Sequence, residues 1–351
     1  MPLNKRKRDS VMNTLSKTLL ASAVILGLTA CGGSDSAPAT TKVDIGVSDA
    51  AIDEVSQVVV HYTKIALLPQ TEGQDPIVLD FEEEVQVVNL LDFQGSKKFL
   101  LLDDQEVLVG DYKACLFVQD GNTANPSLSS HVLLADTTTL QALNVQGNGA
   151  CPQGVGKEEG TGVLFFNNAF TIDAENNNYV IEFDLRGLKE DPKKADDYII
   201  KRTWVDIINT NTTGNLAGSI SENAFLACEA TSPNTEDNGF AHSVYLYPGA
   251  TTEGEIGDVD GELTGTVAPI STSLLTEDTT GGETVYTYEF GFLEPGDYRV
   301  AYTCMANDDA SDTEEPDVLS ADTFTFYSKP DVTAVVKGET AVVTDIDVVA
   351  P

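Results

Sequence analysis

The chain has 351 residues, with 56 Asp and Glu against 20 Lys and Arg and a formal net charge of −36 at pH 7. Nucleic-acid binding requires clustered Lys and Arg that displace counterions, and no such cluster lies outside the N-terminal segment, so we expect no nucleic-acid partner. Hydrophobic residues make up 41% of the chain, which is enough for packed cores, and the length favours two domains over one.

A basic N-terminal segment comes first. Lys and Arg occupy positions 5–8, and an apolar run of about ten residues extends from Leu19 to Leu28. This run is too short to span a membrane as a helix, which needs about 20 residues, and it is typical of a secretory signal. We predict a signal peptide over residues 1–30. Its start stays open between Met1 and Met12, because Met12 would begin a more ordinary signal.

The LTAC run at residues 28–31 resembles the lipobox of bacterial lipoproteins. The resemblance implies cleavage before Cys31 and lipidation of Cys31, which would make the membrane a partner through a lipid anchor. Gly32 stands where many inner-membrane lipoproteins have Asp, so we expect an outer-membrane protein on the periplasmic face or the cell surface. A plain secretory signal with a chance cysteine is the alternative. Residues 31–42 are small and polar, as in a flexible tether.

Strand-like runs begin at residue 43. Val43, Ile45 and Val47 alternate with other residues, and the runs QVVVHYTKIALL, PIVLDFE and EVQVVNLLDF follow at short spacing. Strands interrupted by turns every ten or so residues favour an antiparallel β-sandwich. We therefore predict an all-β domain over residues 43–212, with a helix possible only around residues 136–143.

This first half resembles the N-terminal domain of bacterial envelope lipoproteins grouped as domain-of-unknown-function family 4382. The resemblance covers residues 43–210 and rests on four runs, although Ala51 stands where Pro is usual in the family. It implies no known activity. The four runs are VDIGVSDAAIDEV, VVNLLDF, VLVGDYKA and VIEFDLRGL.

The second half, residues 213–351, resembles the transthyretin-like sandwich, also called carboxypeptidase-regulatory-like or prealbumin-like. The resemblance rests on GNLAGSISE, HSVYLYPGA, the turn LEPGDY and the closing TAVVKGETAVVTDIDVV. Pro295 and Gly296 predict a type II turn with a positive φ at Gly296. Tyr298 would then bury its ring and bond its hydroxyl back to the backbone. Together the two halves predict tandem antiparallel prealbumin/Ig-like β-sandwiches.

One motif occurs in both halves. VGDYK at residues 109–113 and PGDYR at residues 295–299 are each followed by a strand that contains a cysteine. Four cysteines remain besides Cys31, and an even number in an oxidising compartment favours disulfides. We predict Cys115–Cys151 and Cys228–Cys304, one inside each domain. Cross-domain linkage and free thiols are the alternatives.

No catalytic motif is present, so we predict no catalytic residue and no enzyme. His61 lies within an apolar strand, as a structural histidine would. Calcium is the least implausible cofactor, but the acidic loops lack the full set of six to eight oxygen ligands, and solvated turns are the default. The weak calcium candidates are Asp258 and Asp260, and a second acidic group comprises Asp49, Asp53 and Glu54.

The expected function is a lipid-anchored envelope protein that acts as a non-enzymatic binding, adhesion or structural accessory, with a periplasmic or extracellular protein or glycan as its ligand. The alternative is a carbohydrate- or peptide-binding module of a nutrient-uptake system. That alternative would use a platform of aromatic rings for stacking, although strict alternation favours packing into the core instead. The candidate rings are Tyr245, Tyr247, Tyr286, Tyr288 and Phe290.

Overall fold

The computed structural model describes residues 38–50, 55–81, 84–135, 137–147, 149–232, 239–259, 266–309 and 324–347. Residues 38–351 form one compact unit. The predicted signal peptide and Cys31 lie outside the described residues. Within the described ranges, no helix has the length and apolar character needed to cross a membrane.

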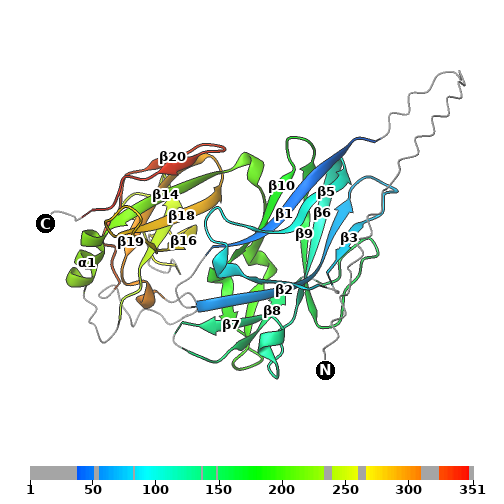
Figure 1. Cartoon of the computed structure of the whole chain (residues 1–351), viewed down its shortest axis with the longest axis horizontal. Coiled ribbons are helices and arrows are strands. Elements are labelled where there is room, and N and C mark those ends of the chain that lie inside the picture. The colour runs from blue at the N-terminus through cyan, green and yellow to red at the C-terminus, as the bar shows by residue number, and fades with distance from the viewer. Residues whose placement is uncertain are drawn as a thin grey trace, which may run out of the picture. The chain divides into compact units, whose positions relative to one another are not determined.

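The first region, residues 40–209, consists of two sheets (Figure 1). One has the strand order β13-β10-β1-β5, and the other has the order β11-β12-β8-β7-β2-β6-β9 with β3 and β4 also paired to β2. The strands are β1 Thr40–Ala50, β2 Val55–Pro69, β3 Ile77–Asp80, β4 Gln86–Asn89, β5 Phe99–Leu108, β6 Gly110–Gln119, β7 His131–Leu134, β8 Gln141–Gln146, β9 Thr161–Ile172, β10 Asn178–Asp184, β11 Leu188–Glu190, β12 Tyr198–Lys201 and β13 Val205–Asn209.

Alternation along the strands forms the core of this region. In β1, Val43, Ile45 and Val47 are fully buried, as the period-two pattern predicts. β10 continues this face with Ile181 and Phe183, which belong to the same hydrophobic cluster. The residues between them point to the opposite side of the sheet, and that side becomes important below.

The second region, residues 214–346, has two four-stranded sheets with the orders β17-β18-β14-β21 and β16-β15-β19-β20. Its own core contains Leu216, Val244, Phe290 and Tyr302. The elements are β14 Gly214–Ser221, α1 Glu222–Thr231, β15 Ser243–Pro248, β16 Ser271–Leu274, β17 Thr276–Asp278, β18 Val285–Leu293, β19 Gly296–Thr303, β20 Thr333–Val335 and β21 Thr340–Val342. Short 3₁₀ turns cover Leu90–Asp92, Pro126–Leu128, Leu185–Gly187, Arg202–Trp204, Thr210–Thr212 and Ala306–Asp308.

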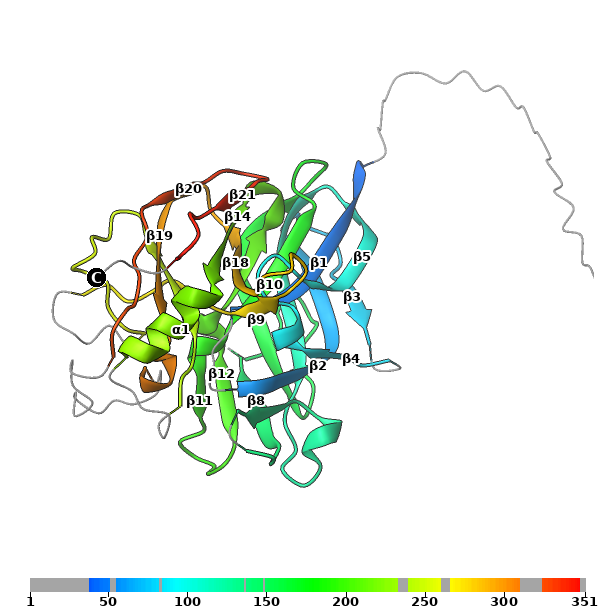
Figure 2. The same ribbon diagram turned by 60° about the vertical axis from the view of Figure 1, so that its left-hand side comes forward.

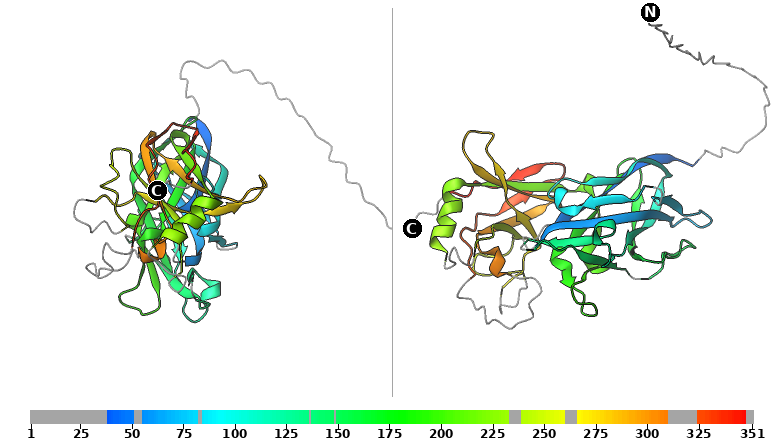
Figure 3. Two further views of the ribbon diagram at one scale, coloured as in Figure 1. Left: turned by 90° about the vertical axis from the view of Figure 1, so that its left-hand side faces the viewer. Right: turned by 60° about the horizontal axis from the view of Figure 1, so that its bottom comes forward.

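The all-β sandwich prediction is confirmed, with two differences. Three ladders are parallel, namely β1 with β10, β8 with β12 and β14 with β21, so three of the four sheets are mixed rather than purely antiparallel. Residues 141–146 form strand β8, not part of a helix. The one described α-helix is α1, which packs against β14 and β18. It lies at the end of the second region that is farther from the first-region strands (Figures 1 and 3), and Figure 2 shows it turned toward the viewer.

Helix α1 begins at an N-cap residue, Ser221, that we did not predict from the sequence. Ser221 has an extended backbone, and its side-chain oxygen accepts a hydrogen bond from the Ala224 N–H. This satisfies one of the free N–H groups of the first turn. The acidic Glu222 in that turn also favours the positive end of the helix dipole.

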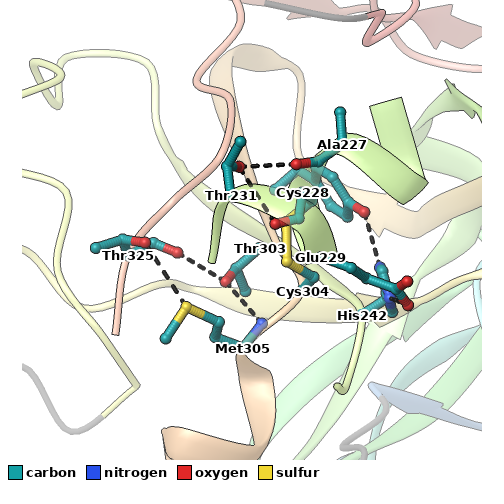
Figure 4. Close-up of a disulfide and its surroundings, with 10 residues drawn as sticks. Ala227, Cys228, Glu229, Thr231, His242, Thr303, Cys304, Met305 and Thr325 are labelled. Carbon is teal, nitrogen blue, oxygen red and sulfur yellow. Dashed lines mark hydrogen bonds and ion pairs between the residues drawn. A yellow bond between two sulfur atoms is a disulfide. The ribbon is translucent and has the colours of Figure 1, made fainter. Parts of the chain in front are cut away.

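The structure contains both predicted disulfides. Cys115 bonds to Cys151 and Cys228 bonds to Cys304, over sequence separations of 36 and 76 residues. The second bond joins helix α1 to the end of β19 (Figure 4). Beside it, Glu229 of the same helix interacts with His242 at 3.2 Å.

The repeated GDY motif forms the same hydrogen bond in both regions. The Tyr112 hydroxyl donates to the Leu108 carbonyl at 2.7 Å, and the Tyr298 hydroxyl donates to the Glu294 carbonyl at 2.9 Å. The predicted type II turn is wrong, because Gly296 lacks a positive φ and already pairs with Val335 in the β19–β20 ladder.

Candidate functional site

A cavity of about 370 Å³ lies where strands of the first region meet strands of the second, and we call it the junction cavity. Six of its lining residues carry carboxyl groups, and none of the described lining residues is Lys, Arg or His. The remainder of the lining is aromatic, aliphatic or small and polar. The six acids are Asp49, Glu182, Asp184, Asp206, Glu289 and Glu294.

Strand alternation places three of these acids together. Glu182 and Asp184 alternate with the core residues Ile181 and Phe183 on β10, so they lie on the opposite face of the sheet. Asp206 of the neighbouring β13 is the direct cross-strand partner of Glu182. Like charges directly opposite each other destabilise a sheet, so this pairing has an electrostatic cost unless a proton or a cation offsets it.

This electrostatic cost favours the protonated form of Glu182. Burial raises its pKa to about 8, and the carboxylates of Asp184 and Asp206 contribute to the rise, while Arg186 opposes it. Desolvation and like charge both disfavour the charged form of a carboxyl group. Glu182 therefore holds a proton at neutral pH when the cavity has no cation.

Arg186 is the cation next to the cavity, and its side-chain N–H groups already donate hydrogen bonds to other groups of the protein. Its Nε donates to Asp184 at 2.8 Å, and its Nη2 donates to the Ile270 carbonyl at 2.7 Å. Its Nη1 also donates to the Pro269 carbonyl, so the side chain ties the end of β10 to the second region. None of the other five cavity acids forms an ion pair within the described residues.

Asp49 is the most unusual of the six acids. It is 3% exposed, and neither of its carboxyl oxygens has a hydrogen-bond partner among the described residues. Burial raises its pKa well above the ordinary value, and Glu182 and Asp184 add to the rise. The Gln94 amide opposes this shift, although its geometry makes no hydrogen bond to either oxygen. Buried polar groups almost always have partners. Asp49 is the register partner of the core residue Phe183, so its carboxyl group lies on the core face of the sheet and not with those of Glu182 and Asp184.

Trp204, the one tryptophan of the chain, forms part of the cavity wall and is 36% exposed. Its ring packs directly over the backbone of Gly187, where an added Cβ would lie 2.0 Å from Trp204 Cγ. A glycine is therefore required at this position. The indole is held against the protein on one side and partly accessible on the other.

Close backbone contacts form the far wall of the junction cavity. A Cβ on Gly291 of β18 would lie 2.1 Å from the Gly95 carbonyl oxygen. Beside them, the Ser96 N–H donates to Glu289 Oε2 at 3.3 Å. The two regions therefore meet through glycine backbones, and this contact positions Glu289 at the cavity.

The predicted calcium site lies largely outside the described residues. Asp258 is described and has interactions of its own, but Asp260, Asp53 and Glu54 lie outside the described residues. No group of three or more His, Cys, Asp or Glu within the described ranges is arranged to hold a metal ion. Calcium at Asp258 and Asp260 stays a prediction.

The aromatic platform of the alternative hypothesis is wrong for most of its residues. Tyr245, Tyr247, Tyr288 and Phe290 are all at most 3% exposed, because their alternation places them inside the core. His61 is also buried and pairs with no second ligand; its backbone N–H donates to Ser130 Oγ.

Sequence reasoning singled out Asp49 but missed the rest of the cavity. The spacing of Glu182 and Asp184 was a usable signal, since two acids at i and i+2 in an apolar strand share one face. A larger hollow of about 970 Å³ lies near residues 119–124 and 158–161. In that hollow, the carboxylate of Glu158 already forms an ion pair with Lys64.

Residues 40–201 match the family model for a domain of unknown function, DUF4382, which confirms the resemblance predicted for the first half. No curated protein sequence matches the chain. The crystal structure of a candidate adhesin from Bacteroides ovatus ATCC 8483 aligns over 92% of this chain and 98% of its own, at 9% identity and a TM-score of 0.19. A TM-score this low carries no argument. The transthyretin-like resemblance of the second half stays a prediction.

Proposed function

We propose that this protein is a lipid-anchored, non-enzymatic binding protein of the bacterial cell envelope, and that its ligand occupies the junction cavity. One observation carries the proposal. Glu182 and Asp206 face each other across β10 and β13 with no ion-pair partner among the described residues, and both line a cavity of a size typical of small-ligand sites. A bound ligand would supply the partner that the protein does not.

The envelope location rests on the sequence. The LTAC run at residues 28–31 supports lipidation of Cys31, and Gly32 supports sorting to the outer membrane. Three acyl chains would hold the protein at the membrane, since each buried CH₂ contributes about 0.8 kcal/mol. Replacing Cys31 by Ser should move the protein from the membrane fraction to the soluble fraction and abolish its labelling with palmitate. Unchanged fractionation and labelling would contradict the anchor.

The cavity contains its own reporter. Because Trp204 is the single tryptophan and forms part of the cavity wall, its emission reports a ligand bound there. The full-length protein in detergent should be screened with glycans, short peptides, small amines and organic acids. We expect a saturable change in emission with at least one class.

Two variants test where that ligand binds. Thr203→Gln enlarges an exposed side chain of the cavity wall and should weaken the response. Thr71→Gln makes the same change in an exposed turn and should leave it unaltered. If none of the four classes changes the emission, the proposed ligand site is wrong.

Carbohydrate binding is the second candidate, and Trp204 is the observation that favours it. A partly exposed indole beside carboxyl groups is suited to stacking on a sugar ring while the acids accept hydrogen bonds from its hydroxyls. A glycan array read with wild type and Trp204→Ala tests this candidate. Release of reducing ends from a bound glycan would contradict the non-enzymatic role.

A further inference from the structure

We propose that the junction cavity binds an organic cation, namely a protonated primary amine or a guanidinium group carried on an apolar body. This inference deepens the proposed function and rests on it. The ligand would place its charged group beside Glu182 and Asp206 and its apolar part against Trp204 and the neighbouring aromatic wall.

The first argument is unbalanced charge. Among the six cavity acids, Asp184 has Arg186 as its counterion, and the others have none within the described residues. Glu182 and Asp206 are direct cross-strand partners on the face that lines the cavity, so this uncompensated pair is the strongest indication of a missing group. A buried carboxylate is normally paired with a cation or coordinates one.

The second argument concerns what kind of cation fits. A hard metal ion needs six to eight converging oxygens, and the described residues hold no group of three or more ligands with that arrangement. Instead, the cavity combines its acids with Trp204, Ile208, Ile270 and Phe292. Such a mixed wall matches a ligand that is charged at one end and apolar along its length.

The third argument is the position of the indole. Trp204 lies on the short turn that precedes β13, two residues before Asp206. A cation within about 6 Å of a tryptophan face is attracted to it, and more strongly when it is removed from water. The turn therefore presents an aromatic face and a carboxylate to the same cavity.

Two sources could supply this chemistry: a free amine or the side chain of a Lys or Arg residue in a protein. Isothermal titration of the full-length protein in detergent separates them. The probes are 1,5-diaminopentane for the free amine, acetyl-Gly-Lys-Gly-amide for the protein side chain, and 1,5-pentanediol as the neutral match. We expect one ligand per protein from an amine probe and no heat from the diol. The tighter amine probe identifies the source.

The variants lie in exposed positions that should leave the fold intact. Asp206→Asn should weaken amine binding about tenfold or more, because a charge-assisted hydrogen bond is worth about 1.5–3 kcal/mol. Trp204→Leu should weaken it about threefold through loss of the aromatic face. Glu72→Gln removes an exposed acid from a distant turn and should change nothing. Circular dichroism of each variant checks the fold.

The inference is overturned if the diol binds as well as the diamine, if neither amine binds, or if Asp206→Asn binds like wild type. These outcomes are distinguishable from failure of the proposed function. A glycan or another neutral compound that shifts Trp204 emission would leave the cavity as a ligand site but exclude a cationic ligand. No response to any class would remove both.

Discussion

Both regions contain the tyrosine hydrogen bond of the GDY motif, but the two tyrosines differ in burial. In the first, Tyr112 is 1% exposed and its strand β6 lies between β2 and the edge strand β9 of the larger sheet. In the second, Tyr298 makes the same hydrogen bond from a half-buried position. The disulfides differ similarly, since one joins β6 to a loop and the other joins α1 to the end of β19. A shared motif therefore fixes local geometry but not its contribution to stability.

Removing the disulfides should produce the largest effect. In the chain-entropy model, the 36-residue and 76-residue separations correspond to about 3.8 and about 4.5 kcal/mol. The double variant Cys228→Ala/Cys304→Ala should therefore lose slightly more unfolding free energy than Cys115→Ala/Cys151→Ala, as measured by urea denaturation. A loss below about 1 kcal/mol in either pair would show that the bond does not constrain the unfolded chain as described.

The tyrosine hydroxyls should show the contrast most clearly. Tyr112→Phe removes a part-buried hydrogen bond and leaves the Leu108 carbonyl without it, so we expect a loss of about 1–2 kcal/mol. Tyr298→Phe exposes the Glu294 carbonyl to water and should cost about 0.5 kcal/mol. Equal losses in thermal unfolding would mean that burial does not distinguish the two corners.

The smallest effect concerns pH. Glu182 has a folded pKa of about 8 against an ordinary value of 4.5, so the folded state holds a proton that the unfolded chain releases. Its contribution to stability is complete below the unfolded pKa and is lost as the pH rises through about 8. Unfolding free energy should therefore fall between pH 6.5 and 8.5.

Glu182→Gln should reduce that fall by about 1 kcal/mol, which allows for partial exposure of the group. Asp49, Asp184, Asp206 and Arg186 surround it and keep their own contributions. Glu72→Gln serves as the control for net charge. The buried histidines do not confuse the measurement, because the pKa values of His61 and His242 are lowered and their cost appears as the pH falls. A variant that follows the wild-type curve would contradict the assignment.

The sequence was informative where the signal was local. Alternation predicted β1, β2 and β18, and the repeated GDY motif indicated both corners and the strands that carry Cys115 and Cys304. The junction cavity could not be predicted, because it brings together residues near positions 49, 182, 204 and 290. That arrangement depends on the parallel pairing of β1 with β10 and on the contact between two regions.

Composition alone could not reveal the junction cavity, because its acids are a small share of the acids in the chain. With 56 acids in the chain, six more or fewer at one place leave no trace in any sequence average. Only their packing shows that Glu182 and Asp206 face each other without a counterion among the described residues while Asp184 has one. The absence of a counterion, not the number of acids, marks the site.

The most direct test is a crystal structure of the protein grown with saturating 1,5-diaminopentane. The account predicts electron density for one diamine in the junction cavity, with an ammonium group within hydrogen-bonding distance of Asp206 or Glu182 and the carbon chain against Trp204. An empty junction cavity, or a diamine bound only elsewhere, would contradict it.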